Sequence, residues 1–181
     1  MKQALIIIDV QNDYFSEGKM ELYQPQLALE KILKVREYFR NQQLPVYYIQ
    51  HINSNPGATF FQPDSHGVEL HHQLLPIADT NEFIIHKSYP NSFLQTTLHE
   101  HLQQQKTDQL VICGMMTHMC VDSTTRQAVE FGYQPIVIAD ACATLNLEFN
   151  STIISATNVQ NSFLAALNYL ATVQSAEQFL S

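Results

Sequence analysis

Positive charge is scarce in this sequence. Only 9 of the 181 residues are lysine or arginine, against 17 aspartate and glutamate residues, so the formal net charge is −8. No run of basic residues occurs, which argues against a nucleic-acid partner and against attraction to an anionic membrane. The acidic balance mainly favours solubility, and we expect the partner to be a small-molecule substrate.

Long apolar runs are also missing. No stretch approaches the ~20 apolar residues that span a bilayer. The N-terminal segment MKQALIIIDVQND turns polar after about five apolar residues, too few for the apolar region of a secretory signal peptide. We therefore expect a cytoplasmic location.

Cysteines are few and show no paired spacing. The three cysteines are Cys113, Cys120 and Cys142, and none forms a C-x-x-C pair. An odd number in a reducing compartment predicts free thiols instead of a disulfide framework. Cys113 lies inside an apolar run and is expected in the core, and Cys142 is expected to be structural. Because no other cysteine lies within a few residues of Cys120, a thiol redox protein is disfavoured.

Apolar runs alternate with helical patterns along the chain, and 181 residues with 45% apolar content predict one domain over residues 1–181 with a sizeable core. Because the runs are continuous, they predict a parallel sheet that is covered on both faces. The fold class is thus a three-layer, doubly wound α/β domain of Rossmann-like architecture. The predicted strands are residues 4–8, 46–51, 82–87, 109–114, 134–140 and 171–175, the predicted helices are 25–42, 92–105, 117–131 and 150–170, and residues 53–81 are read as a long excursion over one face.

Polar residues follow several of these strands. Asp9 follows residues 4–8, Lys87 ends the strand 82–87, and Cys120 opens a helix after the strand 109–114. In an open parallel sheet the carboxyl ends of the strands share one edge, where ligands bind. An acid, an amine and a thiol are therefore expected to meet in one cleft.

These three groups suit nucleophilic catalysis. A thiolate is a nucleophile, and a helix amino terminus favours negative charge by ~0.3–1 kcal/mol. A neighbouring Lys87 ammonium is expected to lower the pKa of the Cys120 thiol further, so that iodoacetamide labels it fast near neutral pH. Asp9 can act first as general base and then as general acid. An Asp9–Lys87 contact would offset the cost of burying either charge alone.

Each of the three residues also has a structural interpretation. Asp9 fits the start of a loop or a helix cap, Lys87 fits a solvated surface position, and Cys120 fits a small buried apolar side chain. Asp140, which ends the run 134–140, is read as a loop or cap residue. Only the conjunction of the three residue types at one sheet edge favours a site.

Four segments carry a resemblance to a known family. They are LIIIDVQNDYF (5–15), IIHKSYPNSF (84–93), VICGMMTHMCVDSTTRQAVEFGY (111–133) and PIVIADACAT (135–144). In order and spacing they resemble the isochorismatase-like cysteine hydrolases, which include nicotinamidases and related small-amide hydrolases. The most specific part is the G-x-x-T-x-x-C pattern of Gly114, Thr117 and Cys120, read together with Asp9 and Lys87.

The resemblance implies a catalytic triad of Asp9, Lys87 and Cys120 on a six-stranded parallel sheet. It implies a cis peptide bond between Met115 and Met116, which aims the backbone N–H groups of Met116 and Cys120 at an oxyanion. It also implies a homo-oligomer, a dimer or a tetramer, for which the apolar late segment ISATNVQNSFLAAL gives only weak independent support.

The implied activity is cysteine-dependent hydrolysis of a small-molecule amide through a thioester acyl-enzyme, with no cofactor. Family members that cleave the vinyl ether of isochorismate lack this cysteine, so Cys120 favours amide chemistry. Two alternatives stay open: a noncatalytic or ligand-binding member of the same fold, and a metal-dependent nicotinamidase.

The metal site of nicotinamidases has no clear match here. That site uses an acid-x-His pair after the second strand and a further histidine downstream, whereas this chain offers His51 and Asn53 in YYIQHINSNPG. His66, His71 and His72 follow without a known ligand spacing, so we predict no metal. His51 is expected either to line the cleft or to lie in a surface loop.

Candidate substrate contacts come from the segments around the triad. Phe15 and Tyr89 equally fit the core, because aromatic side chains commonly fill it, and His118 equally fits the start of a helix. The full set of candidates is Gln11, Phe15, Tyr89, Asn91 and His118.

Overall fold

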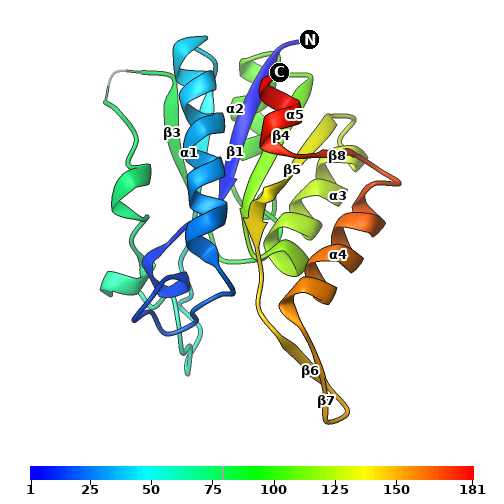
Figure 1. Ribbon diagram of the computed structural model, residues 1–181. Helices are drawn as coiled ribbons and strands as arrows, with labels where there is room; N and C mark the ends of the chain where they lie inside the picture. The colour runs from blue at the N-terminus through cyan, green and yellow to red at the C-terminus, as the bar shows by residue number, and fades with distance from the viewer. Residues whose placement is uncertain (79) are drawn as a thin grey trace.

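The computed structural model describes residues 1–78 and 80–181, so Asp79, inside the predicted excursion 53–81, lies outside the described residues. Six parallel strands form the central sheet in the order β3-β2-β1-β4-β5-β8 (Figure 1). The predicted α/β fold class is confirmed. The strands are β1 (Gln3–Ile8), β2 (Val46–His51), β3 (Glu82–Lys87), β4 (Gln109–Met115), β5 (Gln134–Ala143) and β8 (Thr172–Gln174).

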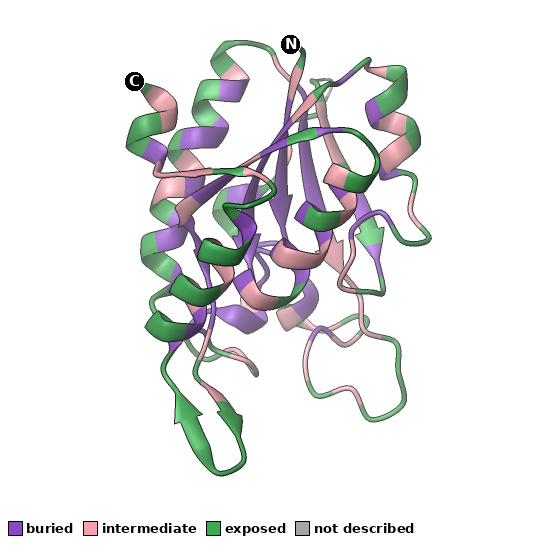
Figure 2. Cartoon of the chain, turned by 90° about the vertical axis from the view of Figure 1, so that its right-hand side faces the viewer, coloured by how far each residue is buried: buried purple, intermediate pink, exposed green. Residues whose placement is uncertain are grey.

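Helices cover both faces of the sheet, and Figure 2 shows the buried sheet between them. Leu5 and Ile7 of β1 pack in one core cluster, and Ile6 and Ile8 pack in the other, because side chains alternate along a strand. The first cluster contains residues of α1 (Pro25–Asn41) and α5 (Ala176–Leu180), and the second those of α2 (Leu98–Gln104), α3 (Asp122–Glu130) and α4 (Ala156–Leu167).

The excursion between β2 and β3 packs on the face that α1 covers. Phe61, Val68 and Leu74 are buried in the same cluster as α1. The buried carboxylate of Asp13 fixes the start of this segment, because its Oδ2 accepts the Phe61 backbone N–H at 2.6 Å. The excursion thus encloses the chain just after β1. It includes two 3-10 turns, η2 (His66–Val68) and η3 (His72–Leu74).

Two predicted helices differ from the prediction at their starts. The helix predicted over 92–105 begins at Leu98, because side chains before it bond to the backbone and compete with helical bonding. Phe93 N–H donates to Asn91 Oδ1 at 2.9 Å, and the Thr96 hydroxyl donates to the Ser92 carbonyl at 2.7 Å. The helix predicted over 117–131 opens as a π-helical turn, η4 (Thr117–Val121), before α3.

The helix predicted over 150–170 is wrong at its start. Residues there form an antiparallel hairpin of β6 (Leu147–Phe149) and β7 (Thr152–Ile154), whose turn residues Asn150 and Ser151 have left-handed φ angles of 49° and 60°. The α4 helix begins only after Ser155, whose side chain accepts the Asn158 N–H at 3.3 Å. The hairpin projects beyond the body of the domain (Figures 1 and 2).

The last part of the sheet differs from the prediction in one respect. The strand predicted over 134–140 continues to Ala143, so Asp140 lies inside β5 and not in a loop. Its cap function is present, because Asp140 Oδ1 accepts the N–H of Ala176 at the start of α5 at 2.7 Å. Within the described residues, no helix is both long and apolar enough to cross a membrane.

Candidate active site

The predicted site lies where the strand order reverses, between β1 and β4. Asp9 directly follows β1, Cys120 lies in η4 just after β4, and Lys87 is the last residue of β3. β2 separates β1 from β3, so the long side chain of Lys87 must reach across it. Ligands of open α/β sheets bind at this edge and at this reversal.

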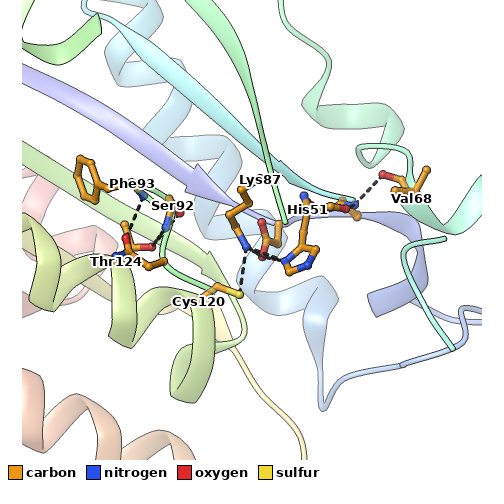
Figure 3. A network of polar contacts seen from close by, with 10 residues as sticks. His51, Val68, Lys87, Ser92, Phe93, Cys120 and Thr124 are labelled. Carbon is orange, nitrogen blue, oxygen red and sulfur yellow. Dashed lines mark hydrogen bonds and ion pairs between the residues drawn. The ribbon is translucent and has the colours of Figure 1, made fainter. Parts of the chain in front are cut away.

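The Lys87 ammonium lies at the centre of the site (Figure 3). Its Nζ donates to Asp9 Oδ2 at 2.7 Å and to Cys120 Sγ at 3.3 Å. The same Nζ lies 2.9 Å from His51 Nδ1. Asp9, Lys87 and Cys120 are 0%, 3% and 4% exposed. The structure therefore brings together the three residues that the sequence predicted, and it adds His51.

Lys87 keeps its positive charge in this buried place. Burial alone would lower its pKa, but Asp9 and Cys120 outweigh burial, so the pKa of Lys87 is raised above its usual value. Lys87 and Asp9 thus form a buried ion pair. Removing one partner of such a pair is costly, because it leaves an uncompensated charge in a dry environment.

The Cys120 thiol is less acidic than a free thiol. Burial and the negative charge of Asp9 raise the pKa of Cys120, and the lowering effect of Lys87 does not offset them. The expected lowering of the Cys120 pKa by Lys87 is present, but burial and Asp9 outweigh it, so the net direction is opposite to the expected one. Fast reaction with iodoacetamide near neutral pH is no longer expected, and the thiol must lose its proton to a base.

Asp9 offers such a base. Its Oδ1 is buried and has no hydrogen-bond partner among residues 1–78 and 80–181. A carboxylate oxygen of Asp9 and Cys120 Sγ lie within 4.8 Å of each other. Oδ2 of Asp9 is thus held by Lys87, while Oδ1 keeps free lone pairs in the same buried centre.

The backbone around Cys120 is tightly constrained. The Met115–Met116 peptide bond is cis, as the resemblance implied. Gly114 has a φ of +123°, and a Cβ there would lie 2.1 Å from the Ile8 carbonyl oxygen, so only glycine lets β4 approach β1 this closely. The Thr117 hydroxyl lies 3.2 Å from the Ala143 carbonyl oxygen and thereby joins η4 to β5.

Two of the predicted substrate contacts, Gln11 and Phe15, have structural partners. The Gln11 amide group bonds to the backbone of His51 and donates to the Val68 carbonyl. The Phe15 ring is buried against the ring of His71, with 4.5 Å between centroids. These two side chains bond to or pack against other parts of the fold.

The other three candidates lie closer to solvent. Asn91 donates to Gln127 Oε1 at 3.2 Å, which ties the chain after β3 to α3. His118 is half-buried, its Nδ1 lies 2.6 Å from Thr144 Oγ1, and burial lowers its pKa. Tyr89 is exposed. Substrate contact by Tyr89 and His118 stays a prediction.

The downstream histidines do not gather into a metal site in the described part of the chain. His66 pairs with Glu69 at 3.2 Å on the surface, and His71 packs against Phe15. The group of possible metal ligands that does form is Asp9, His51 and Cys120, and the Lys87 ammonium contacts all three. The residues present thus do not fit the metal site of nicotinamidases.

His51 is the residue whose role the sequence left undecided. The signal was its place as the last residue of its strand, because His51 pairs in register with Lys87, the last residue of the next strand. Seeing that contact required the register of β2 and β3, which the sequence pattern does not give.

Comparison with known proteins finds related sequences and structures. The family model for the isochorismatase domain matches residues 3–178. The isochorismatase family protein YddQ of Bacillus subtilis (strain 168) is 46% identical over 181 residues, with 99% of each chain covered. The streptothricin hydrolase of Streptomyces noursei is 30% identical over 80% of this chain and 51% of its own length. A crystal structure of an isochorismatase-family protein from Oleispira antarctica superposes with a TM-score of 0.93 at 40% identity, covering 98% of this chain and 95% of that one.

Proposed function

The chain belongs to the isochorismatase family of hydrolases, and we propose that it hydrolyses a small-molecule carboxamide through a thioester on Cys120. One observation carries the proposal: the Lys87 ammonium bridges Asp9 and the Cys120 sulfur, while Asp9 Oδ1 has no partner among the described residues. A nucleophile, a cation and a base with a free lone pair therefore share one buried centre.

The first half of the reaction forms the acyl-enzyme. Asp9 Oδ1 takes the proton of the Cys120 thiol, and the thiolate attacks the amide carbonyl carbon. The oxyanion is held by the backbone N–H groups of Met116 and Cys120, as the family resemblance implies. Asp9 then gives its proton to the amide nitrogen, the C–N bond breaks, and ammonia or an amine leaves a thioester on Cys120.

The second half regenerates the thiol. Asp9 removes a proton from a water molecule, and the resulting hydroxide attacks the thioester. The C–S bond breaks, the carboxylic acid departs, and the sulfur recovers a proton from Asp9. Lys87 keeps its charge throughout and offsets the negative charge that moves between Asp9, the oxyanion and the sulfur.

The raised pKa of the Cys120 thiol fits this scheme. A thiol that stays protonated at rest is protected from adventitious alkylation and oxidation, since the thiolate is the reactive form. Charge separation then occurs only when a substrate is in place to receive the sulfur. The contact between Lys87 and the sulfur supplies the positive charge at that moment.

A metal-dependent nicotinamidase is the weaker alternative, because the histidines after β2 do not assemble a separate ligand set among the described residues. A noncatalytic ligand-binding member would not need a carboxylate with an unpartnered oxygen in the same buried centre as a thiol.

The direct test is to incubate the purified protein with a panel of small carboxamides and measure ammonia or amine release. Cys120→Ala should abolish release and Cys120→Ser should nearly do so, and the acyl-enzyme should appear in acid-quenched samples as an added mass on Cys120. Cys142→Ala serves as the matched control, because this buried thiol lies outside the Lys87 contacts. Release that persists in Cys120→Ala would contradict the proposal.

We also propose that the chain forms a homo-oligomer in the cytoplasm. Support comes from the β6–β7 hairpin, where Phe149 and Ile153 are 70% and 72% exposed on a projecting arm. Exposed apolar residues that cluster in this way mark interaction surfaces. Light scattering should find more than one chain per particle, and Phe149→Ser with Ile153→Ser should shift the particle toward one chain.

A further inference from the structure

His51 and Lys87 are neighbours by strand register. They are the last residues of β2 and β3, and they pair directly across the parallel ladder. Their side chains therefore leave the same face of the sheet, and His51 Nδ1 reaches 2.9 Å from Lys87 Nζ (Figure 3). The imidazole also packs near the ring of Phe61, with 5.9 Å between ring centroids.

The backbone of His51 is held on both sides by one amide group. Gln11 Oε1 accepts the His51 N–H at 2.8 Å, and Gln11 Nε2 donates to the His51 carbonyl at 2.9 Å. The second hydrogen of the same nitrogen goes to the Val68 carbonyl at 2.7 Å. Gln11 is fully buried, so this clamp fixes the end of β2 without solvent competition.

The direction of the His51–Lys87 hydrogen bond follows from chemistry. An ammonium group has three hydrogens and no lone pair, so the imidazole Nδ1 must accept. The ring is then neutral, with its hydrogen on Nε2. Burial and the Lys87 charge also lower the pKa of His51 to about 4, although Asp9 opposes them.

The three hydrogens of Lys87 thus have three acceptors: Asp9 Oδ2, His51 Nδ1 and Cys120 Sγ. If His51 Nδ1 were absent, one hydrogen of the Lys87 ammonium would lose its acceptor. Asp9 Oδ1 is a buried acceptor without a partner among the described residues, and it belongs to the carboxylate that the ammonium already contacts. Lys87 would then turn toward both oxygens of one carboxylate. The oxygen that should receive the thiol proton would be occupied.

We propose that His51 is a positioning residue that takes the third hydrogen of the Lys87 ammonium and so keeps Asp9 Oδ1 free as proton acceptor. Its catalytic meaning rests on the proposed function, but its effect on the acidity of Cys120 does not. His51 does not touch the reacting atoms; it acts through Lys87 and Asp9.

Three substitutions separate this role from simple packing. In His51→Asn the side-chain oxygen stands where Nδ1 stood, since both are attached to Cγ. In His51→Gln the acceptor moves one bond further, and His51→Leu removes it. His66→Asn is the matched control, because the His66 side chain is 84% exposed and lies on the surface.

The readout is the rate constant for carboxymethylation of Cys120 near pH 8, followed by mass spectrometry, because the rate reports the thiolate fraction. His51→Leu and His51→Gln should lower it by about 10-fold or more, the size expected for a lost bond to a charged group. His51→Asn and His66→Asn should stay near the wild-type rate. Equal rates for all four variants would overturn the proposal.

A second measurement needs no variant. Nitrogen-15 NMR of the wild-type imidazole should show His51 as the Nε2–H tautomer at neutral pH, with Nδ1 unprotonated. A hydrogen on Nδ1, in either the neutral or the charged ring, would overturn the proposal even if His51→Leu failed to fold.

These readouts also separate the two proposals. If the labelling rates split as expected but no carboxamide is hydrolysed, the role of His51 stands and the proposed function fails. If carboxamides are hydrolysed but His51→Leu labels and turns over like the wild type, the proposed function stands and the role of His51 fails. If both proposals hold, kcat/KM should fall together with the labelling rate in His51→Leu and His51→Gln. In His51→Asn it should stay near the wild-type value.

Discussion

Two ion pairs lie at opposite ends of the same strand. Glu82 opens β3 at the amino edge of the sheet, and Lys87 ends it at the carboxyl edge. At the amino edge, Arg40 of α1 holds Glu82 with two bonds, Nε to Oε1 at 2.6 Å and Nη2 to Oε2 at 2.9 Å. At the carboxyl edge, Lys87 holds Asp9 with one bond.

The carboxylates differ in how completely they are satisfied. Glu82 Oε2 also accepts the Tyr48 hydroxyl at 2.9 Å and the Ile77 N–H at 3.0 Å, so both of its oxygens are used. Burial raises the pKa of Glu82, but Arg40 and these donors outweigh it and the pKa is lowered. Asp9 keeps one oxygen free among the described residues. A saturated carboxylate only stabilises the fold, whereas one with a free lone pair can exchange a proton.

Removing the cation of each ion pair in turn should give the largest difference between the two pairs. Lys87→Met should abolish hydrolysis and lower the free energy of unfolding by about 3–5 kcal/mol, because Asp9 stays buried without a counter-charge. Arg40→Met should leave activity unchanged and cost only about 1–3 kcal/mol, since the Arg40 side chain is 19% exposed and water can replace part of its bonding. Urea unfolding and carboxamide turnover measure the two effects.

A double variant controls for the loss of side-chain volume. Adding Asp9→Asn to Lys87→Met removes the stranded charge, so part of the lost stability should return while activity stays absent. If Lys87→Met alone were as stable as the wild type, the ion pair would not be the buried structure described above.

A change of pH should alter the stability contributions of the two regions in opposite pH ranges. The effect should be smaller than that of the substitutions, because every side chain stays in place. Glu82 has a lowered pKa, so its contribution to stability is present above its usual value of 4.5 and is lost as pH falls through the lower folded value. Cys120 has a pKa raised from 9.0, so its contribution is present below that pH and is lost as pH rises.

Urea unfolding across a pH series measures the curve of stability against pH and checks both its acid limb and its alkaline limb. Arg40→Met should flatten the acid limb only. Cys120→Ala should flatten the alkaline limb in part, because Cys113 and Cys142 are also buried thiols with raised pKa values. An alkaline limb that Cys120→Ala leaves unchanged would contradict the raised pKa of Cys120.

Tyr48→Phe should give the smallest effect. It removes one of the donors to Glu82 and leaves the paired Arg40 bonds in place. The expected loss is about 0.5–1.5 kcal/mol of unfolding free energy, the usual net value of one hydrogen bond. Thermal unfolding measures it, and activity should not change. A loss as large as that of Arg40→Met would mean that Tyr48, and not the cation, holds the cluster together.

Patterns within single segments predicted the fold well. The strands at 46–51 and 82–87 have the expected bounds, because each is an apolar run between clear turn signals. The β6–β7 hairpin was missed, since its apolar residues resemble a helical face and its Asn150–Ser151 turn lacks the glycine that marks most such turns. The Ser155 cap was the available signal for the true start of α4.

The candidate site was predicted in its members but not in its electrostatics. Strand ends in a parallel sheet share an edge, so Asp9, Lys87 and Cys120 could be placed together from topology alone. The acidity of the thiol depends on burial, which no local pattern gives, and burial reversed the expected direction. The role of His51 depends on the alignment of two strands that lie more than thirty residues apart along the chain.

Because of that alignment, the chemistry depends on the number of residues in β3. Side chains on a strand alternate between faces, so a one-residue deletion inside β3 would turn Lys87 away from Asp9 and toward the opposite face of the sheet, while the sheet itself could re-form. The exposed stretch 54–57 carries no such parity, and lengthening it costs closure entropy only slowly. Engineers can therefore vary that stretch in length, but they can change the strand only by substitution.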